Sequence, residues 1–321
     1  MTTPSVDLSV IVPLAERPSP LDQLYEEFSA PLRASGRSFE FLFVGYTWHR
    51  TLTEPLERLV ARGEPIRLIE VPQALGETAL LKVGGSAARG RILITLPAYL
   101  QAEASTLVPL VEQVEAGADL AVVHRWPRRD SVINRAQNSV LHALVGRLAG
   151  GRLHDVACGL RAMRGELLAE VPLYGDFARF LPLLALREGF RVEEVKGAVH
   201  PRAMRGRIYG PGVYLRRLID VLGLLFLLRF TDKPLRFFGL IGSGLAMTGG
   251  ILLVTVLVQR LGGQTVANRP LLLLGVLLIT LGIQSIALGL IGEMIVHLTA
   301  SRRHRYRVLP TQPRAERTEA A

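Results

Sequence analysis

Residues 8–44 have the sequence LSVIVPLAERPSPLDQLYEEFSAPLRASGRSFEFLFV. This stretch begins and ends with short apolar runs, 8–12 and 39–44, which are rich in β-branched and aromatic residues, as is typical of buried strands. Between them, residues 21–34 have apolar side chains at helical spacing. The stretch therefore predicts two parallel strands connected by a helix.

The same alternation continues to residue 123. Further strands are expected at 66–71, 92–96 and 120–123, and further helices at 52–61, 77–88 and 104–115. Strands that are apolar on both faces imply a mostly parallel sheet covered by helices, and such sheets bind ligands at the carboxyl ends of their strands. Beyond residue 123 the pattern is less regular, with helices expected at 132–148 and 177–188 and a strand at 191–195.

Two long segments near the C-terminus contain no charged residue. They span 237–258 and 270–292, and each exceeds the roughly 20 residues that a helix needs to cross a bilayer. Helices buried in a soluble core are usually shorter and keep a polar stripe. Together with a hydrophobic fraction of 49%, the two segments predict a pair of transmembrane helices.

The charges flanking these helices predict their orientation. Basic residues gather before the first helix and after the second: Arg216, Arg217, Arg229, Lys233, Arg236, Arg302, Arg303, Arg305 and Arg307. The connecting loop has only Arg260 and Arg269, and the N-terminus does not resemble a signal peptide. The positive-inside rule then predicts a multi-pass protein of the inner (plasma) membrane with both termini cytoplasmic.

The overall charge and the cysteine content fit this arrangement. Juxtamembrane arginines that meet anionic headgroups account for most of the net charge of +10, so no nucleic-acid partner is expected. The single cysteine, Cys158, allows no internal disulfide and fits a reducing compartment.

Composition divides the chain into four parts. Residues 211–229 form a Leu- and Arg-rich amphipathic pattern, which suits a helix lying on the membrane surface or an ordinary helix packed on the soluble domain. The residues after 308 have the composition of a disordered tail. We expect an α/β domain at 1–200, a basic loop and juxtamembrane helix at 201–233, two transmembrane helices at 234–299 and a basic tail at 300–321.

Motifs in this order point to a known family. They are LSVIVP (8–13), FLFVGYTWHRT (41–51), GETALLKVGGSAARGRILITLPAYLQ (76–101), DVACGLRAMRGE (155–166), RFLPLLALREGFRVEEV (179–195), HPRAMRGRIYG (200–210), PLRFFGLIG from 234 and RPLLLLGVLLITLGIQSIALGLIGEMI from 269. Over nearly the whole chain, the set resembles glycosyltransferase family 2, in particular the polyprenyl-phosphate glycosyltransferases with two C-terminal transmembrane helices. The resemblance implies a GT-A (Rossmann-like) domain that binds a nucleotide-sugar and transfers the sugar to polyprenyl phosphate.

The acids expected from the resemblance are largely missing. The two Asp that follow the second strand in the family are here Gly45 and Tyr46, and the metal-binding Asp-x-Asp is here Pro97-Ala98-Tyr99. A tyrosine hydroxyl and backbone carbonyls do not replace a carboxylate cage for Mg²⁺ or Mn²⁺. We therefore expect no metal ligands and no cofactor at the usual position, although the family implies a divalent metal.

The resemblance assigns candidate residues to two sides of the cleft. Asp155 keeps the family spacing and is the candidate general base or acceptor-orienting acid, with a helix or turn cap as the alternative. Donor-side candidates are Pro13, Glu16, Gly45, Tyr46, Pro97, Tyr99 and Arg125. Candidates for binding the lipid phosphate are Arg179, His200, Arg202 and Arg205, with nonspecific contact to lipid headgroups as the alternative.

Two functions remain open from the sequence. The first is an inverting transfer of a sugar from a nucleotide-sugar to polyprenyl phosphate at the cytoplasmic face, with arginines in place of the metal. The second is a catalytically impaired relative that binds lipid phosphate or acts as a scaffold for another transferase or flippase. A homo-oligomer or a partner membrane protein is compatible with either function.

Overall fold

The structure is a computed structural model of the 321-residue chain. It describes residues 6–15, 20–46, 50–73, 75–126, 153–156, 158–171, 173, 177–202, 223, 234–262 and 269–300. The chain forms two compact units, Met1–Val213 and Tyr214–Ala321, which we describe separately. The helix predicted at 132–148, almost all of the amphipathic segment and the C-terminal tail lie outside the described residues. The domain limits given above stay predictions.

The first unit is built on a seven-stranded sheet in the order β3-β2-β1-β4-β6-β5-β7. The strands are β1 (Val6–Pro13), β2 (Phe39–Tyr46), β3 (Ile66–Val71), β4 (Gly90–Thr95), β5 (Leu120–Arg125), β6 (Arg161–Arg164) and β7 (Val192–Gly197). The pairings of β1 with β2 and β4, of β2 with β3, and of β5 with β7 are parallel, whereas β6 is antiparallel to β4 and to β5. The mostly parallel sheet predicted from the apolar runs is therefore confirmed.

The sequence pattern did not reveal β6. Its sequence, RAMR, begins and ends with arginine and offers only Ala162 and Met163 as an apolar signal. Both residues are buried, because β6 fills the position between β4 and β5. A strand this short and charged takes its conformation from two neighbours far away in sequence.

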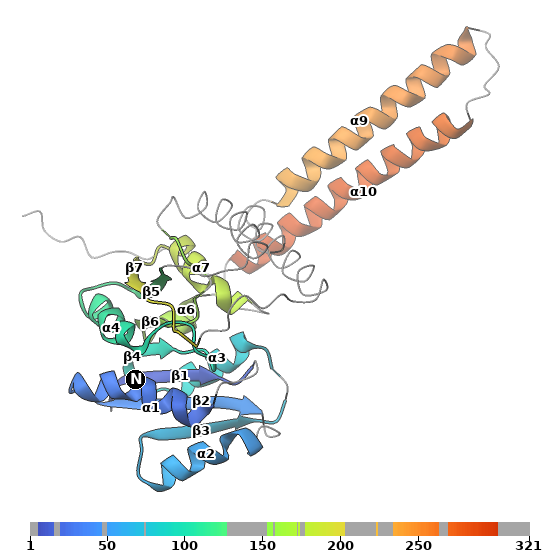
Figure 1. The fold of residues 1–321 in the computed structure, drawn as a ribbon. Helices are drawn as coiled ribbons and strands as arrows, with labels where there is room; N and C mark the ends of the chain where they lie inside the picture. The colour runs from blue at the N-terminus through green and yellow to red at the C-terminus, as the bar shows by residue number, and fades with distance from the viewer. Residues whose placement is uncertain are drawn as a thin grey trace, which may run out of the picture. The chain divides into compact units, whose positions relative to one another are not determined.

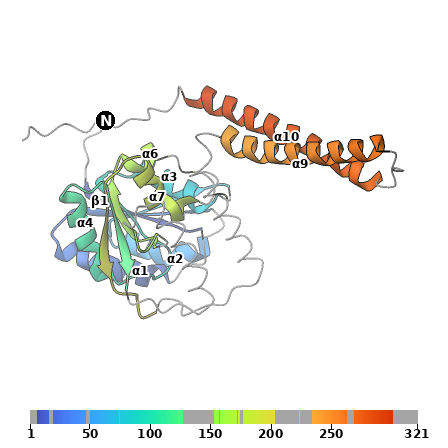
Figure 2. The ribbon, with the colours of Figure 1, turned by 90° about the horizontal axis from the view of Figure 1, so that it is seen from above.

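Helices cover both faces of the sheet (Figures 1 and 2). They are α1 (Leu21–Ala34), α2 (Arg50–Ala61), α3 (Glu77–Ala87), η2 (Ala104–Thr106), α4 (Leu107–Glu115), α6 (Leu167–Glu170), η3 (Phe177–Phe180) and α7 (Leu181–Arg187). Helix α1 contacts α2 and α4 on one face, while α3 contacts α6 and η3 on the other. The helices predicted at 104–115 and 177–188 are present, each with a 3₁₀ turn at its start.

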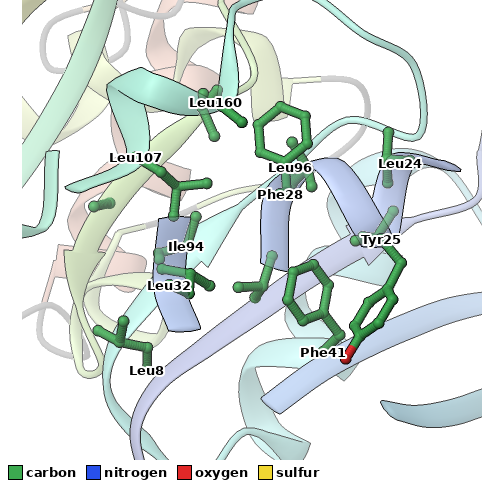
Figure 3. Packing of buried hydrophobic residues seen from close by; sticks show 14 of the residues in the cluster. Leu8, Leu24, Tyr25, Phe28, Leu32, Phe41, Ile94, Leu96, Leu107 and Leu160 are labelled. Atoms are coloured by element: carbon green, nitrogen blue, oxygen red, sulfur yellow. The ribbon is translucent and has the colours of Figure 1, made fainter. Parts of the chain in front are cut away.

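The main core lies between the sheet and the face formed by α1, α2 and α4 (Figure 3). Along α1, the buried residues recur every three or four positions: Leu21, Leu24, Tyr25, Phe28, Ser29 and Leu32. The rings of Tyr25 and Phe41 meet edge to face with centroids 4.9 Å apart. This apolar helix face packed on alternate strand residues fixes the register of β1 and β2.

A buried acid ties the amino-terminal half of the sheet together. The Glu40 carboxylate accepts hydrogen bonds from Ser9 Oγ (2.7 Å), Arg67 Nη1 (3.0 Å) and the Arg89 backbone N–H (2.8 Å). Burial alone would raise the pKa of Glu40, but the hydrogen bonds from Ser9, Arg67 and Arg89 lower it below its ordinary value. Glu40 therefore connects β1, β2, β3 and the start of β4 as an ionised group.

The second unit contains the long helices α9 (Pro234–Leu261) and α10 (Arg269–Ala300), which pair along their length (Figure 1). Both helices are long and apolar enough to cross a membrane. Glycines spaced by seven residues form the contact: a Cβ on Gly242 would lie 2.5 Å from the Gly282 carbonyl, and one on Gly249 would lie 2.6 Å from the Gly275 carbonyl. The backbones thus approach as closely as glycine permits.

Candidate functional site

The predicted donor site lies where the carboxyl ends of β1, β2, β4 and β5 meet one edge of the sheet. Pro13 ends β1 and is buried, and Tyr46 ends β2 and is half-buried. Leu14 fills the space beside Gly45, since a Cβ there would approach Leu14 Cδ1 to 3.0 Å. The position where the family resemblance implies an acid is therefore occupied by apolar packing.

The turn after β4 is held by neutral hydrogen bonds. Gln101 donates from Nε2 to the Tyr99 hydroxyl (2.7 Å) and accepts the Gly159 backbone N–H at Oε1 (2.8 Å). Thr95 Oγ1 donates to the Gly159 carbonyl (2.8 Å), and any Cβ at Gly159 would collide with the buried Pro97. This turn and the segment before β6 are thus locked together through Gly159.

Arg125 and Asp155 form a forked ion pair at the end of β5. Arg125 Nε lies 2.7 Å from Asp155 Oδ2, and Arg125 Nη2 lies 3.1 Å from Asp155 Oδ1. The Asp155 side chain is 0% exposed and that of Arg125 is 18% exposed. The two hydrogen bonds join the buried carboxylate to the guanidinium in a fixed relative orientation. Asp155 was predicted as the acid and Arg125 as a donor contact. In the structure the two side chains form a single ion pair.

Arg161, the first residue of β6, binds the backbone of the segment that contains Asp155. Its guanidinium is buried and donates to four backbone carbonyls: those of Val156 (3.3 Å), Cys158 (2.8 Å), Ala178 (2.7 Å) and Arg179 (3.1 Å). Burial lowers the pKa of Arg161, although arginine stays protonated in proteins. Burial also raises the pKa of the neighbouring Cys158 thiol, which suits a packing residue rather than a nucleophile.

The predicted acceptor side follows β7. His200 is buried, with Nε2 2.8 Å from Glu27 Oε1 on α1 and Nδ1 accepting the Arg202 backbone N–H at 3.0 Å. The Arg202 side chain is exposed and donates to Gln23 Oε1 at 3.3 Å. The Arg179 guanidinium lies 5.9 Å from the centre of the Phe180 ring. Of the three acceptor-side candidates that the structure describes, His200 and Arg202 lie together and Arg179 lies on η3.

Two candidates, Glu16 and Arg205, lie outside the described residues.

For the described part of the chain, the residues at Gly45, Tyr46, Pro97, Ala98 and Tyr99 do not fit a divalent cation, because they supply no carboxylate oxygen. Polar groups at this edge include the phenols of Tyr46 and Tyr99, the Gln101 amide and the Arg125 guanidinium. Such groups can hydrogen-bond a diphosphate or a sugar hydroxyl without a metal.

Sequence comparison finds relatives named as polyprenyl-phosphate sugar transferases along about nine-tenths of the chain. The chain is 30% identical over 298 residues to dodecaprenyl-phosphate galacturonate synthase of Rhizobium johnstonii, covering 91% of this chain and 88% of the relative. It is 29% identical to undecaprenyl-phosphate 4-deoxy-4-formamido-L-arabinose transferase of Pseudomonas paraeruginosa, covering 94% and 89%. The chain belongs to the polyprenyl-phosphate glycosyltransferases. No protein-family model matches it.

Solved structures place this polyprenyl-phosphate glycosyltransferase in the GT-A fold. Glucosyl-3-phosphoglycerate synthase from Mycobacterium tuberculosis, solved with uridine-diphosphate, aligns with a TM-score of 0.52 over 70% of this chain and 80% of its own. The two proteins are 20% identical, so the likeness concerns the fold alone. The predicted fold class is confirmed for the sheet and for the two apolar helices, which together with the family support membrane association.

Several residues that hold the candidate site together were not predicted from the sequence. Gln101, Gly159 and Arg161 were quoted within motifs but received no role, because their partners lie on other elements. A signal was available for Arg161, since an arginine between Leu160 and Ala162 in an apolar run must find polar partners once it is buried.

Proposed function

We propose that this chain transfers a sugar from a nucleotide-sugar to polyprenyl phosphate at the membrane surface. The observation that supports this most directly is the match to two transferases named for such lipid acceptors, which spans about nine-tenths of each protein and both compact units. In the reaction, a phosphate oxygen of the lipid attacks the anomeric carbon as the bond to the nucleotide diphosphate breaks. The protein must then stabilise the charge that develops on the leaving diphosphate.

For the donor side we propose that hydrogen bonds and a guanidinium replace a carboxylate-bound metal. Arg125 lies at the end of β5, and its Nε and Nη2 engage Asp155. The fork fixes the plane and the position of the guanidinium, so its positive charge stands at a defined place at the end of β5, where it can stabilise an anionic leaving group. In this proposal Asp155 is a positioning residue rather than a general base. Tyr46 and Tyr99, together with Pro13, Gly45, Pro97 and Glu16, remain the proposed donor contacts.

For the acceptor side we propose that arginines hold the lipid phosphate. Arg202 is exposed, and Arg179 lies on η3, next to the carbonyls that Arg161 binds. His200 contributes by fixing the backbone of Arg202 through Nδ1. Arg205 is included because it belongs to the same basic loop. A polyprenyl phosphate has its charge at headgroup depth, where guanidiniums next to a membrane can bind it.

The membrane arrangement is also a proposal: α9 and α10 cross the inner membrane, and both termini are cytoplasmic. Basic residues on the outer flanks of the two helices support it. Single cysteines placed at Gly263 and at Thr311 should respond differently to an impermeant thiol reagent on intact cells, with labelling at Gly263 only. Labelling at Thr311 alone would contradict this arrangement and would indicate that the termini lie outside.

A second candidate function is supported by the ion pair itself. At the carboxyl ends of the described strands, Asp155 is paired with Arg125, and the turn at residues 97–99 is uncharged. A catalytically impaired relative would keep lipid-phosphate binding and would act through a partner membrane protein or a second copy of itself. It would need neither a metal nor a general base.

One assay distinguishes the two proposed functions. Purified full-length protein in detergent is mixed with undecaprenyl phosphate and a panel of radiolabelled nucleotide-sugars, with Mn²⁺ or with EDTA. The first candidate predicts a labelled lipid product that forms equally well with EDTA. Lipid binding without product from any donor would favour the second candidate. Product that forms only with Mn²⁺ would contradict the metal-free mechanism.

A further inference from the structure

Two histidines and a glutamate from β5, β7 and the segment before β6 lie close together, next in sequence to the ion pair. His124 lies on β5, Glu194 lies on β7 and His154 lies in the segment before β6. One ligand atom from each of them falls within 4.8 Å of the other two. Because Arg125 follows His124 and Asp155 follows His154, this triad and the ion pair share the same two pieces of backbone.

The contacts within the triad are specific. His154 Nδ1 lies 2.9 Å from Glu194 Oε2, and His124 Nδ1 lies 4.0 Å from the same oxygen. The two imidazole rings are nearly parallel, with centroids 5.2 Å apart and an interplanar angle of 13°. Glu194 Oε1 accepts the backbone N–H groups of His154 (2.5 Å) and Asp155 (3.1 Å). One carboxylate oxygen thus fixes the backbone, while the other faces both histidines.

We propose that His124, His154 and Glu194 bind a divalent transition-metal ion, with Zn²⁺ as the best match, at a site separate from the sugar-nucleotide site. Two imidazoles and one carboxylate are a ligand set that suits Zn²⁺ rather than Mg²⁺, which prefers oxygen ligands. Three protein ligands leave a fourth position of a tetrahedral ion to solvent.

The geometry requires only small shifts, because Glu194 Oε2 lies 4.0 Å from His124 Nδ1 and 2.9 Å from His154 Nδ1. Bonds of about 2.0–2.2 Å to a tetrahedral ion place ligand atoms about 3.4 Å apart, closer than the 4.8 Å limit within which the three atoms now lie. The His154 side chain is 65% exposed and has room to shift and admit an ion, whereas those of His124 and Glu194 are 18% and 11% exposed and lie on strands of the sheet. The ion would take the place of the direct contact between His154 and Glu194 Oε2.

Metal binding here would act on the segment that positions Asp155. Glu194 Oε1 already accepts the Asp155 backbone N–H, so an ion on Oε2 and His154 would restrict the same loop from its other side. We expect the bound ion to raise the melting temperature of the full chain, because a ligand that binds only the folded state stabilises it. This consequence does not depend on the proposed transferase activity.

The experiment measures metal binding with neither nucleotide nor lipid present. Full-length protein in detergent, without a polyhistidine tag and stripped by a chelator, is titrated with Zn²⁺ by calorimetry and with Co²⁺ by visible absorption. We expect one equivalent of Zn²⁺ and a Co²⁺ spectrum with tetrahedral character, with no comparable binding of Mg²⁺. The variants H154Q and E194Q should each weaken the Zn²⁺ Kd by about 100-fold or more.

Two features keep the outcome interpretable. E194Q retains an amide oxygen for the two backbone N–H groups but loses the charged ligand, and H154Q changes an exposed side chain, so both should fold. The matched control is H297Q, which removes a histidine from α10 and should leave Zn²⁺ binding unchanged. The absence of stoichiometric Zn²⁺ binding, or equal binding by wild type, H154Q and E194Q, would overturn the proposal.

Discussion

The guanidinium of Arg125 holds both carboxylate oxygens of Asp155, with Nε–Oδ2 and Nη2–Oδ1 distances of 2.7 and 3.1 Å. The sequence places these residues 30 positions apart, and the fold joins them at the carboxyl end of β5. The only acid among the residues predicted for catalysis is therefore engaged by a cation in the folded chain. In the proposed mechanism, Asp155 acts by positioning Arg125.

Disrupting this pair tests that role. D155N leaves a mostly buried guanidinium without its counter-charge and should cost about 3 kcal/mol of unfolding free energy. R125K keeps the charge but loses the fork, and should lower the rate of sugar transfer by about 100-fold. If Asp155 were instead a general base, R125K would retain most of the activity while D155N would lose it. Thermal melts and initial transfer rates in detergent measure both effects.

The proposed lipid-phosphate contacts can be separated from general membrane attraction. Neutralising Arg179 and Arg202 together, as R179Q/R202Q, should weaken polyprenyl-phosphate binding by about 1–3 kcal/mol for each charged hydrogen bond lost. Phosphatidylglycerol binding should change little, since it depends on overall charge. Binding of both lipids in the same detergent provides the measurement. An equal loss for both would remove the case for a specific lipid-carrier site.

Glu40 predicts a defined acid sensitivity. Its pKa in the folded protein is below its ordinary value of 4.5, so the unfolded state takes up protons first as the pH falls. The stability that Glu40 contributes is present above about pH 4.5 and is lost as the pH falls through the lower folded pKa. E40Q should cost about 1–3 kcal/mol at neutral pH and should flatten the acid limb of the Tm-against-pH curve. An acid limb unchanged from wild type would contradict this assignment.

The glycine contact between α9 and α10 predicts unequal effects at adjacent residues. A Cβ on Gly249 would press on the Gly275 carbonyl, whereas one on Gly250 would meet nothing within 4 Å. G249L should therefore separate the helices and lower the Tm of the full chain in detergent, and G250L should not. Disulfide trapping between cysteines placed on the two helices provides a second readout. Equal effects of G249L and G250L would show that the helices do not pack through this face.

Local patterns were sufficient for much of the fold. The helix at 21–34 and the strand at 66–71 match α1 and β3 residue for residue, because apolar spacing reports directly which face of an element is buried. The strand β6 could not be predicted in this way. Its four residues have too little periodicity, and they form a strand because β4 and β5 leave room between them.

The sequence by itself determined that the chain has a sheet of alternating strands and helices, two apolar helices, and Gly45, Tyr46 and Pro97 where the resemblance implies acids. These features depend on composition and on the spacing of residues that are near one another in the chain. Only the tertiary structure decided that Asp155 is neutralised by Arg125, that four carbonyls surround Arg161, and that two histidines meet Glu194. These side chains belong to elements remote in sequence, and their charges become partners only when burial removes the water that would otherwise solvate them.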